Sequence, residues 1–158
     1  MPRTTATDAG EQKLLDNIRK FGWHCMNVFG DAEHEQFSYT IGLFQTHGHT
    51  ELLIYGLPPE VAHSVLNIAA QAATAENPLN LTEPTDELLE GYSCVFVPVP
   101  LTEYPEHVGF ARWYYEGDAF PVHQVVWPSK SGLFPWHPEA SPAFREKQPV
   151  LGKHESSV

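Results

Sequence analysis

The spacing of apolar residues divides the chain into helical and extended segments. Near the start, apolar residues recur every three or four positions, the period of an amphipathic helix, at Leu14, Leu15, Ile18 and Phe21. A broader apolar face follows Pro58 and Pro59 and ends near Asn77; proline in the first turn of a helix loses no helical hydrogen bond. A further helix is predicted after Pro105. The pattern therefore predicts two or three helices.

Five other segments have the pattern of β-strands. Apolar and small polar residues alternate from Phe37 to Leu43, which is the period of a half-buried strand. The five predicted strands cover residues 23–29, 36–44, 51–57, 92–100 and 121–127. The connections between the first three are too short for the crossovers that parallel strands need. We therefore predict an α+β fold, with a mainly antiparallel sheet of about five strands packed against two or three helices.

The length of 158 residues fits a single domain. The periodic patterns fall within residues 10–137, which are predicted to form that domain. Residues 1–9 are small and polar, and we expect them to be a disordered tail. Residues 138–158 contain three prolines and are predicted to form an irregular tail.

The charge of the chain excludes some classes of partner. Nine basic residues face twenty acidic residues, and the formal net charge is −11. Such a field repels nucleic acids and anionic membrane surfaces. There is no apolar leader and no apolar run of about 20 residues that would span a membrane. We therefore expect a soluble, cytoplasmic protein, in which Cys25 and Cys94 are buried free thiols.

The segment HGHTE offers two interpretations. If residues 47–51 are extended, His47, His49 and Glu51 point the same way and could bind zinc or iron. Three ligands from one extended run chelate poorly, however, because their side chains are about 7 Å apart. We therefore expect no metal or other cofactor, and interpret the segment as a connector. In that interpretation Glu51 anchors the chain by accepting hydrogen bonds near Tyr39 or Thr40.

Polar residues near aromatic residues indicate a pocket. His63 and Asn67 are one helical turn apart, and neighbours at this spacing share a helix face. Three consecutive aromatic residues, 113–115, cannot all face one core, so at least one of them should reach a surface or a partner. Arg112 would add a positive charge there. The candidate ligand-binding residues are Tyr39, Thr40, Glu51, His63, Asn67, Arg112, Trp113, His123, Gln124, Trp127 and Trp136.

Several phrases along residues 20–137 resemble a family of uncharacterised bacterial proteins, the DUF4262 family. They lie in the stretches GWHCMNV, FSYTIGL, ELLIYGLPPEVAHSVLN and QVVWPSKSGLFPW. Thr50 stands where the family usually has a proline, which implies a freer loop. The resemblance implies no particular reaction. The chain is more distantly similar to suppressor-of-fused-type domains, which have a similar Thr-Ile-Gly-Leu strand and are associated with protein interaction and, in bacteria, toxin immunity.

Three classes of function remain open. The favoured one is a binding module for a small ligand or a protein partner. This class includes an immunity-like role, and it includes a module that forms a homodimer. The second is an enzyme of unknown reaction whose acid and base come from His63, His123, Glu51 or Tyr39. A nucleophilic cysteine, paired as Cys25–His24 or Cys94–His123, belongs to the same class. The third class is a metal-binding or flavin-binding protein.

Overall fold

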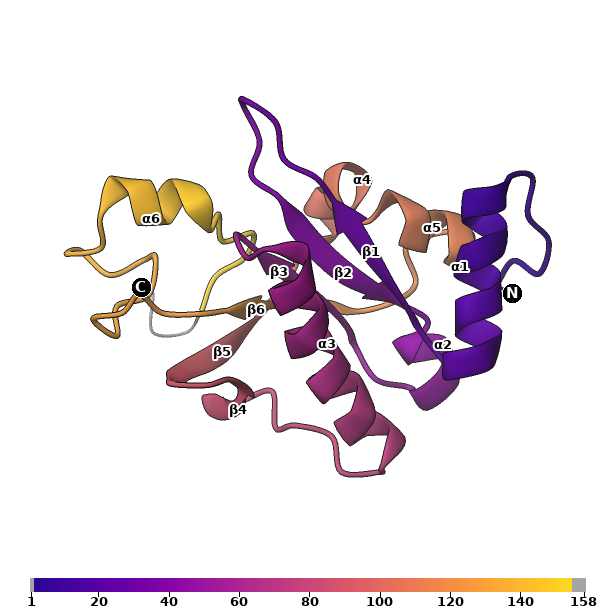
Figure 1. Cartoon of the computed structure of the whole chain (residues 1–158), viewed down its shortest axis with the longest axis horizontal. Coiled ribbons are helices and arrows are strands. Elements are labelled where there is room, and N and C mark those ends of the chain that lie inside the picture. Colours follow the sequence, from indigo (N-terminus) through magenta and orange to yellow (C-terminus); the bar gives the residue numbers. More distant parts are fainter. Residues whose placement is uncertain (1, 155–158) are drawn as a thin grey trace.

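The protein forms one six-stranded sheet, seen in a computed structural model that describes residues 2–154 (Figure 1). The strand order across the sheet is β1-β2-β3-β6-β5-β4. The strands are β1 (His24–Val28), β2 (Phe37–Ile41), β3 (Glu51–Tyr55), β4 (Thr85–Leu89), β5 (Tyr92–Pro98) and β6 (Val122–Val126). All five predicted strands are present, and β4, between α3 and β5, is an additional strand that the sequence pattern did not predict.

The sheet is mixed, which corrects the prediction of a mainly antiparallel sheet of about five strands. Strands β1, β2 and β3 pair antiparallel, as expected from their short connections. Strand β6, however, enters between β3 and β5, parallel to β3 and antiparallel to β5. The long connection through α3, β4 and β5 allows this insertion. Its central position explains why four of the five residues of β6 are buried.

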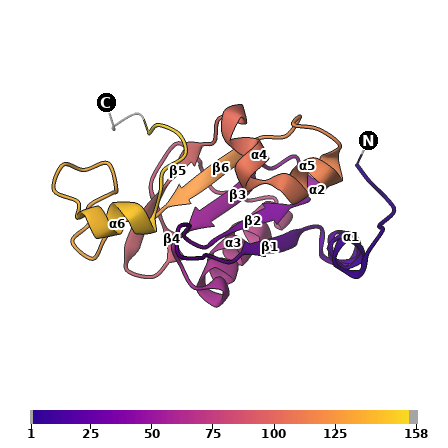
Figure 2. The ribbon, with the colours of Figure 1, turned by 90° about the horizontal axis from the view of Figure 1, so that it is seen from above.

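Helices cover both faces of the sheet. The helices are α1 (Ala9–Phe21), α2 (Leu43–His47), α3 (Pro59–Thr74), the 3-10 helix η1 (Leu101–Glu103), α4 (Tyr104–His107), α5 (Gly109–Tyr115) and α6 (Pro142–Lys147). Figure 2 shows α3 on one side of the sheet and α4 and α5 on the other. One apolar cluster joins α1, α4 and α5 to the sheet, and a second joins α3 to the opposite face. Among the described residues, no helix has both the length and the apolar character needed to cross a membrane.

The second predicted strand ends earlier than expected, because Gly42 turns the chain. Its φ angle is 111°, a left-handed conformation that favours glycine. A Cβ atom on Gly42 would also lie 3.1 Å from the carbonyl oxygen of Gly22. The chain continues as the short helix α2, so His47 lies in a helix and the HGHTE segment is not one extended run.

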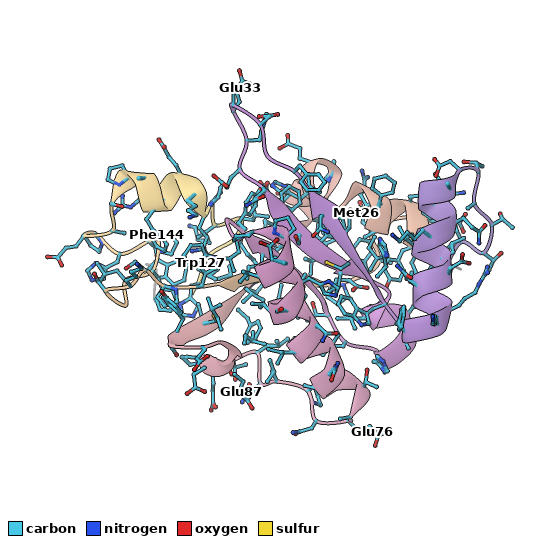
Figure 3. The ribbon with its side chains drawn as sticks, in the orientation of Figure 1. Met26, Glu33, Glu76, Glu87, Trp127 and Phe144 are labelled. Carbon is cyan, nitrogen blue, oxygen red and sulfur yellow. The ribbon has the colours of Figure 1, made fainter. Side chains whose placement is uncertain are left out.

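The C-terminal segment packs against the sheet. Helix α6 lies in a region predicted to be irregular, and the ring of Phe144 contacts the ring of Trp127 edge-on at 5.2 Å (Figure 3). Gln148 is fully buried, and its side chain hydrogen-bonds to both the N–H and the C=O of Trp127. Gln124 bonds in the same way to the backbone of residues 149 and 151. The final four residues of the predicted tail, 155–158, lie outside the described residues.

The N-terminal segment has no regular secondary structure from residue 2 to residue 8, yet it contacts α5. The Arg3 backbone N–H donates to the carbonyl oxygen of Tyr114, and the Arg3 side chain donates to that of Trp113. The guanidinium group also lies 5.2 Å from the centre of the Trp113 ring. Residue 1 lies outside the described residues.

Candidate functional site

An open cleft of about 440 Å3 is bordered by helices α1 and α3 and by strand β1, which contacts both helices. We call it the α1–α3 cleft. Figure 1 shows β1 at the edge of the sheet, passing between α1 and α3. Its lining residues are Lys13, Asn17, Phe21, Trp23, His24, Cys25, Asn27, His63 and Asn67.

The α1 wall follows from the spacing of three residues. Lys13, Asn17 and Phe21 are four residues apart, which places them along one face of the helix. Gly22 ends the helix in the left-handed conformation, with φ of 90°, and its N–H donates to the carbonyl oxygen of Ile18 at 2.8 Å. This turn carries the chain directly from α1 into the start of β1.

The α3 wall is the polar border of an otherwise buried helix. The face of α3 that packs on the sheet consists of Ala62, Val65, Leu66, Ala69, Ala70 and Ala73. His63 and Asn67 lie beside this face, and both line the cleft. The His63 ring meets the Trp23 ring edge-on, with centres 5.8 Å apart. The prediction that His63 and Asn67 are neighbours on one helix face agrees with this arrangement.

Much of the hydrogen-bonding capacity of the cleft is unused. The Asn17 amide donates to Nδ1 of His24 at 2.9 Å, which leaves Nε2 of His24 as a donor. The Asn27 oxygen accepts from Ser38 at 2.7 Å, which leaves its amide N–H groups. The side chains of Lys13, His63 and Asn67 make no hydrogen bond to any described residue. A ligand in this cleft would therefore find several donors and acceptors without competing for existing bonds.

His24 and Cys25 are held in their neutral forms. Burial lowers the pKa of His24, and the charges of Lys13 and His63 lower it further. Burial raises the pKa of the Cys25 thiol to about 11. The thiol also lies 3.8 Å from the Asn27 side-chain oxygen, to which it donates. A protonated thiol is a poor nucleophile, so the geometry gives no support to the Cys25–His24 pair as a catalytic site.

The charge of the cleft differs from that of the whole molecule. The chain has twenty acidic residues, but no Asp or Glu is among the lining residues. Lys13 is the one residue in the cleft with a permanent charge. A more open groove of about 570 Å3 at the β4 edge has the opposite character, since Asp86, Glu87 and Glu90 line it. We place the candidate site in the smaller cleft because polar and aromatic side chains from three elements converge there.

Glu51 belongs to a separate, closed arrangement, the Glu51 cluster. The side chain is fully buried and accepts five hydrogen bonds. Burial raises the pKa of the carboxyl, and the hydrogen bonds oppose that shift. The donors are the hydroxyls of Thr40 and Tyr115 and the backbone N–H groups of Gly42, Leu43 and Phe44.

This cluster confirms the prediction that Glu51 anchors the chain by accepting hydrogen bonds near Thr40. His47, His49 and Glu51 do not lie together as a group of ligands. In the described part of the chain, only Glu103, Glu106 and His107 form a group of three ligand side chains close enough for one ion. Nε2 of His47 instead lies 3.2 Å from the Thr74 hydroxyl. Nδ1 of His49 hydrogen-bonds to the carbonyl oxygen of Thr50 at 2.7 Å.

Several predicted site residues lie at the centre of the fold, away from the cleft. The Tyr39 hydroxyl accepts from the backbone N–H of Phe110 at 3.2 Å. His123 contacts the hydroxyl of Thr50 at 2.8 Å. Trp127 is buried, and its indole N–H donates to the carbonyl oxygen of Tyr55. Gln124 holds the C-terminal segment, as described above. Of the predicted set, only His63 and Asn67 line the cleft.

The remaining predicted residues occupy two further places. Nε of Arg112 forms an ion pair with the Asp118 carboxylate at 2.6 Å. The neighbouring residue Trp113 carries the Arg3 guanidinium group over its ring. The Trp136 ring stacks on the Phe134 ring at 5.0 Å, over strands β5 and β6. Tyr115 is half-buried, as expected of one member of the 113–115 run, but it contacts Glu51. Cys94 is fully buried, and burial raises its pKa to about 11.

Sequence reasoning missed most of the cleft. Lys13, Asn17 and Phe21 form a visible four-residue spacing, but only the apolar stripe of that helix was interpreted. Asn27 alternates with Cys25 and Trp23 on the first strand, and an isolated asparagine among apolar residues was the available signal. What the pattern lacks is the relative placement of α1 and α3, which are separated in sequence by β1, β2, α2 and β3.

The fold and the cleft define the class of protein: an α+β domain with a mixed, two-sided sheet and a polar cleft at the β1 edge. The chain belongs to the family described as "Domain of unknown function (DUF4262)", which matches residues 17–141. This confirms the resemblance seen in the sequence. The more distant similarity to suppressor-of-fused-type domains stays a prediction. No curated protein matches the chain, and no solved structure does.

Proposed function

We propose that the protein is a binding module whose α1–α3 cleft takes up a small polar molecule. The observation that carries the proposal is the convergence, from three elements, of amide and imidazole side chains with unused hydrogen-bonding capacity. Buried polar side chains are usually saturated with bonds inside the protein, as Glu51 is, whereas His63 and Asn67 are accessible from the cleft. The volume of about 440 Å3 falls in the range of small-molecule sites.

Binding is favoured over catalysis because the cleft holds no activated nucleophile. The Cys25 thiol is protonated, since its pKa is about 11. An imidazole acting as a strong base is usually oriented by a carboxylate, and no carboxylate lines the cleft. The polar groups are therefore better suited to recognising a ligand than to transforming it.

A fragment screen by two-dimensional NMR tests this function. We expect compounds that bind to shift backbone amide signals within residues 13–27 and 63–67, saturably and at one site. The double variant His63→Ala/Asn67→Ala should weaken binding at least tenfold. His34→Ala is the matched control, because His34 is exposed in a distant turn. Shifts that map elsewhere, or equal affinity for the double variant and the parent, would contradict the proposal.

A further inference from the structure

We propose that the ligand of the α1–α3 cleft is a flat ring that carries a single carboxylate. This inference rests on the proposed function and adds the chemical class of the ligand. It follows from the distribution of aromatic, charged and amide groups along the cleft.

One end of the cleft is aromatic. Phe21 ends helix α1, and Trp23 directly precedes β1; only Gly22 separates the two aromatic residues. The His63 ring lies against Trp23. The Phe21 side chain is 58% exposed, and the Lys20 ammonium group lies 5.2 Å from the centre of its ring. A flat ring of a ligand would cover it, because aromatic surfaces gain from stacked or edge-on contact.

Lys13, the one lining residue with a permanent charge, lies at the other end of the α1 wall. Eight residues of helix separate Lys13 from Phe21, a rise of about 12 Å. Because the Lys13 side chain is long, its ammonium group can reach toward the centre of the cleft and lie closer to Phe21 than this rise. Lys13 and His24 both line the cleft, and the charge of Lys13 contributes to lowering the pKa of His24. His24 and Asn17 then supply neutral donors beside the ammonium group.

This arrangement selects one negative charge. A carboxylate would receive the Lys13 ammonium group together with imidazole or amide N–H donors, and charge-assisted bonds of this kind are the strongest available here. A cationic ligand would find no counter-charge, because no Asp or Glu lines the cleft. Lys13 is the only cation among the lining residues, and the Lys20 ammonium group lies beside them, over the Phe21 ring. The net charge of −11 opposes anions, but charges farther than about 8 Å are screened at physiological salt.

Matched pairs of compounds test this inference by NMR titration. The probes are benzoate with benzamide, nicotinate with nicotinamide, and indole-3-acetate with indole-3-acetamide. Each pair keeps the ring and changes only the charge. We expect at least one acid to bind in the cleft tenfold or more tightly than its amide. Lys13→Met should reduce the affinity for the acid to that for its amide, and should leave the affinity for the amide unchanged. Lys130→Met, the control, removes the same charge from an exposed turn outside the cleft.

The outcomes separate this inference from the proposed function. If acids and amides bind the cleft equally, or if Lys13→Met retains the preference for acids, the ligand class is wrong while the cleft remains a binding site. If Lys130→Met loses as much affinity for the acids as Lys13→Met does, the preference for acids comes from the overall charge of the protein. That result would also overturn the inference. If no member of any pair shifts the cleft signals, the ligand class fails, and the broader fragment screen alone decides the function.

Discussion

The Glu51 cluster and the α1–α3 cleft gather polar side chains in opposite ways. Every oxygen lone pair that Glu51 offers meets a donor, and the carboxylate is fully buried. In the cleft, His63 and Asn67 remain accessible and make no hydrogen bond to described residues. The comparison teaches that polarity alone does not mark a functional site. A saturated polar cluster stabilises the fold, whereas an unsaturated one at the surface is available for a ligand.

The comparison predicts that the largest loss of stability comes from Glu51→Gln. One carboxamide oxygen can still accept, but the new N–H groups face donors such as the Tyr115 hydroxyl. We expect the free energy of unfolding to fall by about 2–4 kcal/mol, measured by urea denaturation. Glu90→Gln is the control, an exposed carboxylate in the β4-edge groove, and should change stability by less than about 0.5 kcal/mol. Similar losses in both variants would break the comparison.

Tyr115→Phe tests the same cluster with a smaller change. The hydroxyl donates to Glu51 and accepts from the Gln45 backbone N–H at 3.2 Å. Its removal should lower the free energy of unfolding by about 1–2 kcal/mol. Combining it with Glu51→Gln should give less than the sum of the two losses, because the residues share a bond. Additive losses would show that Tyr115 and Glu51 act independently.

The cleft should behave differently when its polar residues are removed. His63→Ala/Asn67→Ala takes away two exposed or half-buried side chains from α3 and replaces them with the best helix former. We expect the free energy of unfolding to change by less than about 1 kcal/mol, measured by the same denaturation. A loss as large as that of Glu51→Gln would mean that these residues serve the fold and not a ligand.

The smallest effect concerns the pH dependence of stability through His24. Burial and the neighbouring charges of Lys13 and His63 lower its pKa below the ordinary 6.5. As pH falls below 6.5, the unfolded chain therefore takes up a proton before the folded protein does, and stability decreases. His24→Gln removes this uptake, so it should lose less stability than the parent between pH 7.5 and 5.5. If the parent and His24→Gln lose the same stability over this pH range, the pH dependence of stability comes from groups other than His24.

Part of the fold was predictable because its patterns are local. The alternation from Phe37 to Ile41 predicts β2, and the four-residue periodicity predicts α1 and α3. The parallel pairing of β3 with β6 was missed, because the sequence between them does not state where β6 enters the sheet. Helix α2 was missed for a different reason. Gly42 interrupts a run whose alternation, taken alone, continues to Leu43.

The candidate site was less predictable than the fold. The anchoring role of Glu51 could be predicted, because a carboxylate at the start of a strand lies near the N–H groups of the preceding turn. The pair His63 and Asn67 was visible for a similar local reason. Trp127 and Gln124 attracted a functional interpretation but serve the core and the C-terminal segment. Aromatic and amide residues support folds and ligands alike, and burial separates the two roles.

Local patterns and composition were enough to predict the helices, most of the strands, the family and the acidic character of this protein. Each of these depends on residues that are near one another in the chain or on composition. The entry of β6 into the centre of the sheet and the approach of α1 to α3 beside β1 became visible only in the folded protein. An acid-free cleft arises from packing between distant segments, which no local period encodes.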